Sequence, residues 1–397
     1  MKKINEFFET PVTESFEVAV AGGGIAGIAA ALAAARQGAR TVLIEKSYLL
    51  GGLATAGLVT IYLPLCDGRG TQVSYGIAEE LLKTSILHGY EQDYPKAWLE
   101  EGTLEEKKKQ RFQVQYNAQL FALEAETLLK KENITIFYGT SVCALSVDNQ
   151  KITHVIVENK SGRSAFEVKS VVDATGDADL CRQSGEETVL FSQQNILAAW
   201  YYHTGKRGYR LRMLGVADIP EEDKTEESPL LSPRRFQGID GKELSEMTQL
   251  AHEVLLEDVK EHRKEDNEYF PTTVATIPQV RMTRRLKGKY EMETSDEGRD
   301  FSDSIGMIGN WKKRGPVYEI PFGALYGNRI RNLITAGRCI SAKDAMWDVT
   351  RVIPGCAVTG QAAGTAAAIS DDFAALDIKI LQKKLKEQGC RLFYEEL

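Results

Sequence analysis

The 397-residue sequence lacks several patterns that would place it in other protein classes. None of its six cysteines forms a C-x-x-C pair, which excludes a local zinc-ribbon or iron–sulfur framework and indicates reduced thiols in a cytoplasmic protein. No long basic run is present. The 49 Lys and Arg against 56 Asp and Glu leave a net charge of −7, which disfavours nucleic acid and anionic membranes as partners. No H-E-x-x-H motif or histidine pair at ligand spacing occurs, so we expect no metal.

The N-terminal region gives no sign of export or membrane insertion. Residues 1–16 contain two lysines but no apolar stretch typical of a signal peptide. Residues 18–35 carry no charge and approach the length of a membrane helix. They nevertheless contain Gly22, Gly23, Gly24 and Gly27 and are followed at once by Arg36. A strand, a glycine turn and a helix explain this run better than a membrane span.

The remaining pattern predicts an α/β fold. A strand at 16–21, an alanine-rich helix at 25–37 and a strand at 41–45 make a βαβ unit. Further on we expect a helix at 113–131, a strand at 332–336 and a small-residue helix at 354–369. Strands at 134–138, 142–147, 152–158, 165–169 and 171–174 include a β-meander, because turn residues separate them at 148–150 and 160–162. The fold class is therefore a Rossmann-like domain with a parallel sheet and a β-meander.

Between Cys181 and Tyr318 the composition changes. Aromatic residues cluster at 200–202, an acidic loop runs from 221 to 227, and 241–265 is a long amphipathic helix. At about 150 residues per domain, the chain length allows two or three domains. We therefore expect a second, α+β domain that carries the substrate.

The turn between the first strand and helix fits G-x-G-x-x-G. Gly22 permits the tight turn, Gly24 lets backbone N–H groups approach a pyrophosphate, and Gly27 lets helix and strand pack closely. Glu45 ends the next strand, where a carboxylate accepts hydrogen bonds from a ribose diol. The helix N-terminus adds partial positive charge for the phosphates. Together these residues predict a dinucleotide site.

Three later features favour FAD over NAD as that dinucleotide. Gly51 and Gly52 follow the ribose carboxylate, with Ala54 and Thr55 beyond, and bring backbone next to a second flat or phosphorylated group. A buried strand at 171–177 ends in small residues and a carboxylate, and 333–338 repeats that theme near the C-terminus. A simple NAD domain requires neither of the last two. Only one G-x-G-x-x-G occurs, so no dedicated NAD(P)H domain is expected.

The motifs GGGIAGIAAALAAARQG, VVDATGDADL and NLITAGRCIS…RVIPGCAVTGQAAGTAAA resemble the FAD-dependent oxidoreductase family. This family is related to fumarate-reductase-type flavoproteins and to the flavin subunit of heterodisulfide reductases. The resemblance implies non-covalent FAD in a discontinuous domain formed by 1–60, 112–182 and 317–397. Residues 61–111 and 183–316 then form the substrate or cap domain.

The resemblance also implies where FAD is held. It places Gly22, Gly24 and Ala26 at the phosphates, Glu45 and Lys46 at the ribose, and the backbone of Val142 at the adenine. Gly52, Ala54 and Thr55 would approach the pyrophosphate and flavin. The remaining expected contacts are Ile25, Gly27, Gly51, Ala174, Thr175, Gly176, Asp177, Gly337, Arg338, Arg351 and Ile353.

Arg281 and Arg285 are the candidate catalytic residues. Guanidinium groups bind carboxylates bidentately and stay charged at any working pH. As a strand, the two side chains would share a face, and as a helix all three arginines of 281–285 would nearly do so. Relatives resemble this stretch with R-E-T-R-R, so Met282 replaces an acid here. We expect one of these guanidiniums to orient a carboxylate-bearing small-molecule substrate against the flavin, although a surface role for a basic triplet stays open.

The sequence leaves three functions open. The first is hydride transfer between FAD N5 and a small organic molecule. The second is a flavin enzyme without net redox change, of the hydratase or isomerase type. The third is a flavin electron-transfer subunit of a larger complex, although this chain lacks cysteine clusters for an iron–sulfur centre. The sequence identifies neither the substrate nor the electron acceptor or donor.

Overall fold

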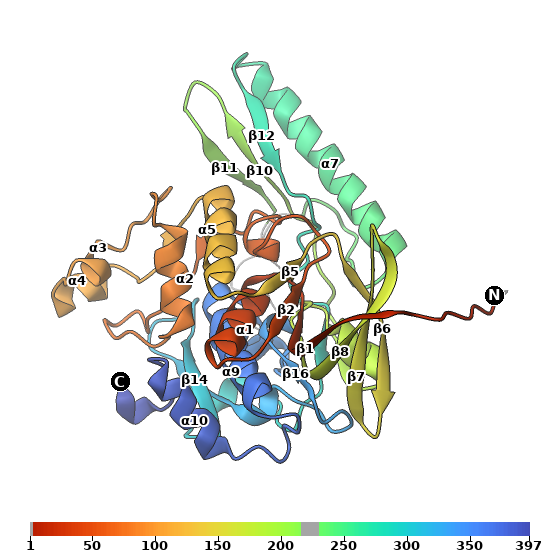
Figure 1. The fold of residues 1–397 in the computed structure, drawn as a ribbon. Coiled ribbons are helices and arrows are strands. Elements are labelled where there is room, and N and C mark those ends of the chain that lie inside the picture. Colours follow the sequence, from red (N-terminus) through yellow and green to blue (C-terminus); the bar gives the residue numbers. More distant parts are fainter. Residues whose placement is uncertain (1–2, 216–229) are drawn as a thin grey trace.

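A seven-stranded mixed sheet forms the centre of the molecule (Figure 1). The computed structural model describes residues 3–215 and 230–397, so the acidic loop at 221–227 lies outside the described residues. The strands of this sheet are β1 (Val12–Ala21), β2 (Thr41–Ile44), β5 (Thr135–Phe137), β6 (Ser141–Asp148), β7 (Lys151–Asn159), β8 (Gly162–Asp173) and β16 (Leu333–Thr335). Their order is β5-β2-β1-β8-β7-β6, and β16 also pairs with β8.

The parallel half of the sheet contains the expected βαβ unit. Helix α1 (Ile25–Arg36) connects β1 to β2, which pair in parallel with Val20 opposite Leu43. β8 lies on the other side of β1, with Val172 opposite Val20, and β5 and β16 extend the sheet in parallel. β6, β7 and β8 pair antiparallel. The predicted Rossmann-like sheet with a β-meander is confirmed.

Two element boundaries differ from the prediction. The two strands expected at 165–169 and 171–174 form one continuous strand, β8. It bridges both halves of the sheet, and the hydroxyl of its buried Ser170 donates to the Ser370 carbonyl at 2.8 Å. The helix expected from 113 begins only at α5 (Ala118–Lys131), because the Asn117 side chain caps its first N–H groups.

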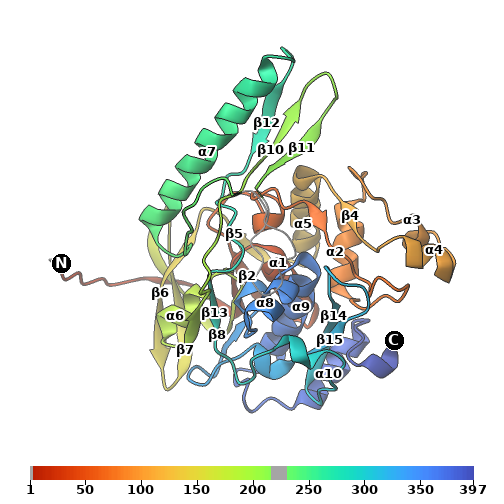
Figure 2. The same cartoon turned by 180° about the vertical axis from the view of Figure 1, so that it is seen from behind.

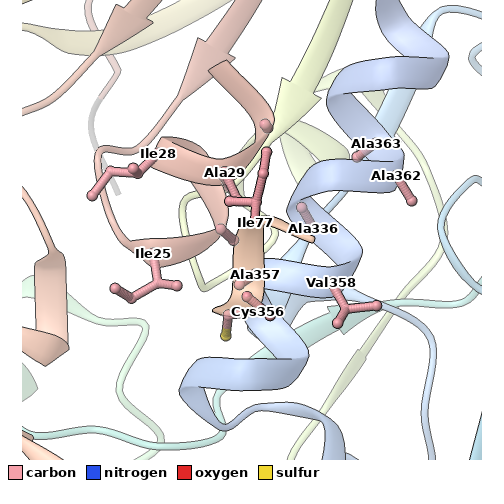
Figure 3. Packing of buried hydrophobic residues seen from close by; sticks show 14 of the residues in the cluster. Ile25, Ile28, Ala29, Ile77, Ala336, Cys356, Ala357, Val358, Ala362 and Ala363 are labelled. Atoms are coloured by element: carbon pink, nitrogen blue, oxygen red, sulfur yellow. The ribbon is translucent and has the colours of Figure 1, made fainter. Parts of the chain in front are cut away.

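Helix α9 (Ile353–Ile369) packs against α1 through small residues (Figure 3). A Cβ atom at Gly360 would lie 2.4 Å from the Ala26 carbonyl oxygen, and one at Gly364 would lie 2.0 Å from that of Ala30. Such short distances leave no room for a side chain, so the glycines allow the two helix backbones to touch. The contact brings the start of α9 next to the glycine turn.

Around this core lie short elements from distant parts of the chain. The two-stranded sheets are β3 (Ile61–Tyr62) with β4 (Val114–Gln115), β9 (Thr188–Leu190) with β13 (Arg284–Leu286), and β14 (Ser304–Gly309) with β15 (Val317–Pro321). The remaining helices of the core region are α2 (Ile77–Ser85), α3 (Lys96–Leu99), α4 (Leu104–Lys109), α6 (Asp179–Ser184), α8 (Asp344–Thr350) and α10 (Ile378–Glu387). Tyr62, Leu65 and Ile77, in the segment assigned by sequence to the cap, share their hydrophobic core with α1 and α9.

A second layer projects from this body (Figure 2). It consists of a sheet in the order β11-β10-β12, formed by β10 (Ala199–Thr204), β11 (Arg210–Leu214) and β12 (Phe270–Val274). The predicted long helix is α7 (Gly241–Arg263), which packs on this sheet through Leu255 and Val259 against Tyr201 and Tyr269. We call this sheet with α7 the cap sheet.

Within the described part of the chain, no single helix is long and apolar enough to cross a membrane. By length and composition alone, one bent pair passes that test, namely α8 and α9, with 84° between them.

Candidate active site

A cavity of about 870 Å³ lies at the carboxyl ends of β1, β2 and β8, where α/β proteins commonly bind ligands. Its wall also includes residues of α7 and of the segment that precedes β13. Most residues assigned by sequence to the cofactor line this one cavity: Gly22, Gly24, Ile25, Ala26, Glu45, Lys46, Gly51, Gly52, Ala54, Val142, Ala174, Thr175, Gly176, Asp177, Arg338, Arg351 and Ile353.

Three residues of the same set lie behind the wall and have packing roles. A Cβ atom at Gly27 would lie 1.8 Å from the Gly22 carbonyl oxygen, so only glycine lets α1 approach the turn. Gly337 has a φ of 71°, and a Cβ there would lie 2.7 Å from that of Ala26. The Thr55 hydroxyl donates to the Leu50 carbonyl and holds the turn that carries Gly51 and Gly52.

The glycine turn leaves open space beside the start of α1. Gly22 has a φ of 103°, which a residue with a side chain rarely adopts. Apart from Gly24 itself and its two neighbours in the chain, no described residue has an atom within 4 Å of the Cβ position of Gly24, so that position faces open space. No side chain caps α1 at this residue. The helix N-terminus is therefore free to offer backbone N–H groups and partial positive charge to an anion in the cavity.

Glu45 has a second task besides the one predicted. Its Oε2 accepts the backbone N–H of Gly23 at 2.6 Å, and its Oε1 accepts that of Ser47 at 2.7 Å. The side chain lines the cavity and is buried. Each carboxylate oxygen can accept more than one hydrogen bond. Glu45 can thus hold the turn and still bind a ribose hydroxyl.

The strand end at 173–179 is organised by Asp173, which the sequence analysis did not assign to the site. Its Oδ1 accepts the Thr175 hydroxyl at 2.6 Å, and its Oδ2 accepts the N–H groups of Leu180 and Cys181 at the start of α6. Asp173 is completely buried. It therefore shapes the loop, while Thr175 and Gly176 form the cavity wall.

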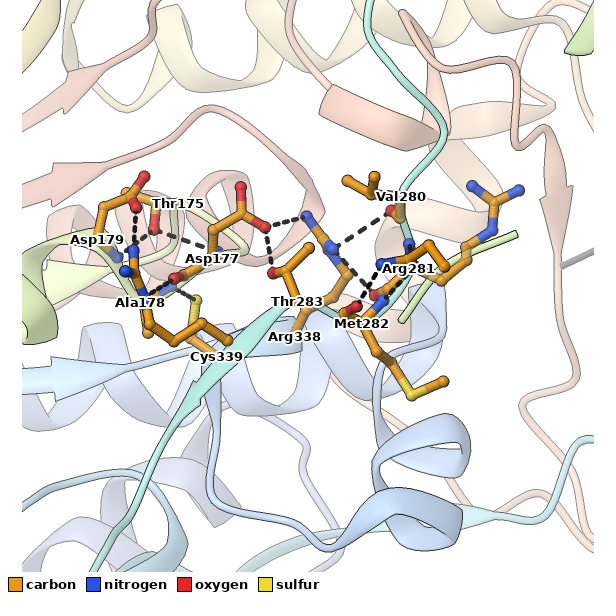
Figure 4. A network of polar contacts seen from close by, with 12 residues as sticks. Thr175, Asp177, Ala178, Asp179, Val280, Arg281, Met282, Thr283, Arg338 and Cys339 are labelled. Carbon is orange, nitrogen blue, oxygen red and sulfur yellow. Dashed lines mark hydrogen bonds and ion pairs between the residues drawn. The ribbon is translucent and has the colours of Figure 1, made fainter. Parts of the chain in front are cut away.

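Asp177 connects the loop at 173–179 to residues 280–283 and to Arg338 of the C-terminal motif (Figure 4). Its Oδ1 accepts the Thr283 hydroxyl at 2.6 Å and an N–H of Arg338 at 3.3 Å. Arg338 also donates to the carbonyl oxygens of Val280 and Arg281. One carboxylate and one guanidinium thus join three distant chain segments at the cavity.

Arg281 is the buried cation of the cavity wall. It is 3% exposed, lines the cavity, and lies over the Trp200 ring at 5.2 Å. Its Nη1 donates to the Gln279 carbonyl at 3.3 Å, and within the described residues its Nη2 makes no hydrogen bond. Burial, followed by repulsion from Arg351 and Arg338, lowers the pKa of the guanidinium to about 9, against an opposing pull from Asp348. An anion in the cavity would relieve this cost.

The segment that carries Arg281 is held by Asn195, another residue that the sequence analysis missed. Asn195 is completely buried, and its Oδ1 accepts the backbone N–H groups of Arg281 at 2.8 Å and Met282 at 3.2 Å. Its Nδ2 donates to the Met282 carbonyl at 2.7 Å. Within the sequence, an isolated asparagine gives no signal for this role.

Arg285 is not placed with Arg281. Its Nη1 donates to Glu291 Oε2 at 2.5 Å, its guanidinium lies 5.7 Å from the Trp347 ring, and it is absent from the described cavity wall. Arg284 pairs with Asp179 at 2.5 Å. The three arginines thus have three separate anionic or aromatic environments, and of the two predicted catalytic residues the cavity receives Arg281.

A further cluster of charged side chains lies at the part of the cavity wall formed by Arg351. Asp348 is fully buried between Arg351, which lines the cavity, and Lys312, whose Nζ is 2.7 Å from Asp348 Oδ2. Cys356 also lines the cavity; its Sγ donates to the Arg351 carbonyl at 3.1 Å, and burial raises its pKa to about 11. Cys339 lies behind the wall, where its sulfur accepts the Ala178 N–H. Both sulfur atoms thus form hydrogen bonds with backbone groups.

One face of α7 completes the wall. The lining residues recur at intervals of three and four along the helix: Gly241, Leu244, Ser245, Thr248, Gln249 and His252. The sequence analysis expected a long amphipathic helix here but did not select its cavity face, because the residues there are mostly small and polar. His252 is exposed and also lines the cavity.

An uncapped helix N-terminus, a glycine with open space beside it, a buried carboxylate at the next strand end and a long cavity make this a dinucleotide-binding α/β protein. The family model of the FAD dependent oxidoreductases matches residues 17–196 and 232–385. The chain belongs to this family: its cofactor is FAD and it is an oxidoreductase.

Solved structures match this chain at low identity. A geranylgeranyl bacteriochlorophyll reductase-like protein from Thermoplasma acidophilum is 14% identical with a TM-score of 0.46, over 95% of this chain and 82% of that chain. The p-nitrophenol 4-monooxygenase PnpA from Pseudomonas putida is 14% identical with a TM-score of 0.44, over 94% and 84%. Among curated proteins, no sequence matches significantly. Likenesses of this strength do not identify a substrate.

Proposed function

We propose that this enzyme oxidises or reduces a small organic molecule that carries a carboxylate. FAD, held without a covalent bond, supplies a hydride acceptor or donor at N5 of its flavin ring. The observation that carries the proposal is the buried, incompletely hydrogen-bonded guanidinium of Arg281 in the cavity wall. A desolvated arginine is the residue type best suited to bind a carboxylate with two parallel hydrogen bonds.

The proposed roles of the other residues follow from their placement in the cavity. The N–H groups after Gly24 would bind the pyrophosphate, and Glu45 would bind the ribose. Arg338 and Arg351 would add positive charge near the flavin side. Asn195 would keep the Arg281 backbone fixed, so that the guanidinium presents the same face in each turnover. The free thiols of all six cysteines support a reducing, cytoplasmic setting.

The holoenzyme tests this proposal directly. Acid treatment should release FAD. Under anaerobic conditions a panel of small carboxylic acids should then include a compound that changes the flavin absorbance through repeated turnovers, whereas its primary amide should not. Replacing Arg281 by Gln removes a charge-assisted hydrogen bond, about 1.5–3 kcal/mol, so kcat/KM should fall roughly 10- to 150-fold. Equal rates with acid and amide, or full activity of the Arg281→Gln variant, would overturn the carboxylate assignment.

A matched control separates this effect from general loss of charge. Arg314 is exposed, and its guanidinium donates to the backbone of Gly68 and Lys108 rather than into the cavity. The Arg314→Gln variant should keep both FAD content and turnover.

A further inference from the structure

Part of the cavity wall is formed by aliphatic side chains at every second position of residues 59–63, the segment that contains β3. Val59, Ile61 and Leu63 all line the cavity and are only half-buried. Thr60 and Tyr62, the residues between them, are completely buried on the other side. Burial therefore alternates along residues 59–63 as it does on the two faces of a strand, and the three half-buried aliphatic side chains give the cavity an apolar surface.

A second apolar surface comes from the segment between β12 and β13. Ile277 and Pro278 line the same cavity and are half-buried. Their position next to the first wall is set by main-chain contacts, because the Thr276 N–H donates to the Ala56 carbonyl at 2.9 Å and the Gln279 side chain donates to the Gly57 carbonyl. Two short apolar surfaces from distant parts of the chain thus meet at one end of the cavity.

This apolar end adjoins the buried cation. Arg281 follows Pro278 by three residues, and its Nη1 donates to the Gln279 carbonyl within the same segment. Figure 4 shows its guanidinium pointing away from the contacts of Asp177 and Arg338. Its Nη2 is the atom that makes no hydrogen bond within the described residues. A charged group and an uncovered apolar surface are therefore available to one small ligand.

We propose that the substrate is an amphipathic monocarboxylate, with its carboxylate on Arg281 and an apolar chain or ring between Val59–Leu63 and Ile277–Pro278. This inference rests on the proposed function and adds the apolar part of the substrate. Half-exposed aliphatic side chains inside a cavity favour an apolar ligand, because binding removes both surfaces from water. The residues of this end belong to none of the motifs that account for the nucleotide.

Straight-chain monocarboxylates from acetate to decanoate provide the test, each compared with the primary alcohol of equal length. Binding to the FAD-loaded holoenzyme is followed by the perturbation of flavin absorbance and by tryptophan fluorescence. Since the holoenzyme already contains FAD, a dependence on chain length cannot arise from the nucleotide site. The dissociation constant should fall about fourfold for each added CH₂ until the apolar end is filled. Alcohols should bind more weakly than acids at every length.

Three variants distinguish the two parts of the proposal. Ile277→Ser in one apolar surface and Val59→Ser in the other should flatten the dependence of the dissociation constant on chain length, while acetate binding persists. Arg281→Gln should weaken all acids by a similar factor and leave that dependence intact. The control is Leu256→Ser, because Leu256 lies on α7, is 52% exposed and is not part of the cavity wall.

The outcomes are separable. If Arg281→Gln weakens binding but affinity does not change with chain length, the apolar site is wrong and the proposed function stands. If acids and alcohols bind alike, or if Arg281→Gln has no effect, the carboxylate assignment is wrong. If no compound of the series binds at millimolar concentration, the straight-chain amphipathic substrate is overturned, whereas the proposed function is decided by the panel of carboxylic acids and amides.

Discussion

Oε2 of Glu45 accepts a 2.6 Å hydrogen bond from the backbone N–H of Gly23, across 22 positions of the sequence. The carboxylate that the sequence assigned to a ribose is therefore also a support of the glycine turn. This double use changes what a substitution at Glu45 should do.

We expect Glu45→Ala to weaken FAD binding and to destabilise the FAD-free protein as well. The variant loses two hydrogen bonds from N–H groups to a charged acceptor, each about 1.5–3 kcal/mol. Glu45→Gln retains a carbonyl oxygen that accepts a hydrogen bond. Its FAD affinity and its stability should therefore fall between those of Glu45→Ala and the wild type. Thermal unfolding of the apoprotein and titration with FAD measure the two effects. A normal melting temperature for Glu45→Ala would contradict the supporting role.

Substitutions at Gly24 and Gly27 should affect different properties of the protein, namely FAD binding and stability. Gly24 has a φ of −70° and open space at its Cβ position, so Gly24→Val should fold normally and fail to bind FAD, because its side chain occupies the phosphate's approach. Gly27→Ala places a Cβ atom against the Gly22 carbonyl and should lower stability whether or not FAD is present. Far-UV circular dichroism with melting curves, followed by FAD titration, separates the two. Similar behaviour of both variants would argue against the assigned turn.

Glu291 should matter for stability rather than for substrate. Glu291→Gln leaves the Arg285 guanidinium buried with its charge uncompensated. We expect a loss of roughly 2–3 kcal/mol, below the 3–5 typical of fully buried pairs because the Glu291 side chain is 28% exposed. Glu187→Gln is the control, since Glu187 is half-exposed and pairs with exposed Lys287 and Arg329. Its loss should stay within about 1 kcal/mol in urea denaturation. Equal losses for the two variants would refute the assignment.

Glu91 should make stability depend on pH. Burial raises the pKa of its carboxyl above the ordinary 4.5, although hydrogen bonds from Tyr202, Asn117 and Gln115 oppose this. The folded protein thus keeps a proton that the unfolded chain has released. This contribution is complete below about pH 4.5 and is lost as pH rises through the raised pKa.

Glu91→Gln cannot ionise, so its stability relative to the wild type should increase as pH rises above 4.5. Melting temperatures of both proteins across that range provide the measurement. Glu253→Gln, at an exposed position of α7, is the control and should show no trend. A difference between Glu91→Gln and wild type that stays constant with pH would disprove the prediction.

The dinucleotide half of the site was predicted from signals that are local in the sequence. The glycine positions, the strand and helix periods and the carboxylate at the end of β2 lie within one βαβ unit. Backbone geometry imposes those requirements on a short stretch of chain, and they remain visible without knowledge of the rest. The motifs near Asp177 and Arg338 were visible for the same reason, and their joining by a hydrogen bond at 3.3 Å follows from the parallel pairing of β8 and β16.

The substrate half could not be predicted to the same depth. The face of α7 that lines the cavity carries small and polar residues, so its periodicity does not separate it from a solvated helix. Asn195 is a single polar residue whose Oδ1 accepts a backbone N–H 86 positions away, and Asp173 accepts the N–H groups of Leu180 and Cys181 within its own loop. Hydrogen bonds to backbone leave no signature in residue type or spacing.

The sequence by itself determined the fold class and the cofactor, because local glycine and periodicity requirements and the quoted motifs encode them, and it predicted the place of the nucleotide. Only the tertiary structure decided that Arg281 enters the cavity, whereas Arg285, four positions later, pairs with Glu291. Spacing places two side chains on one face of a regular strand, but Arg281 precedes β13 and its backbone is held by Asn195. The surroundings of a charged side chain depend on what packs against it from distant segments, and that information appears only once the chain has folded.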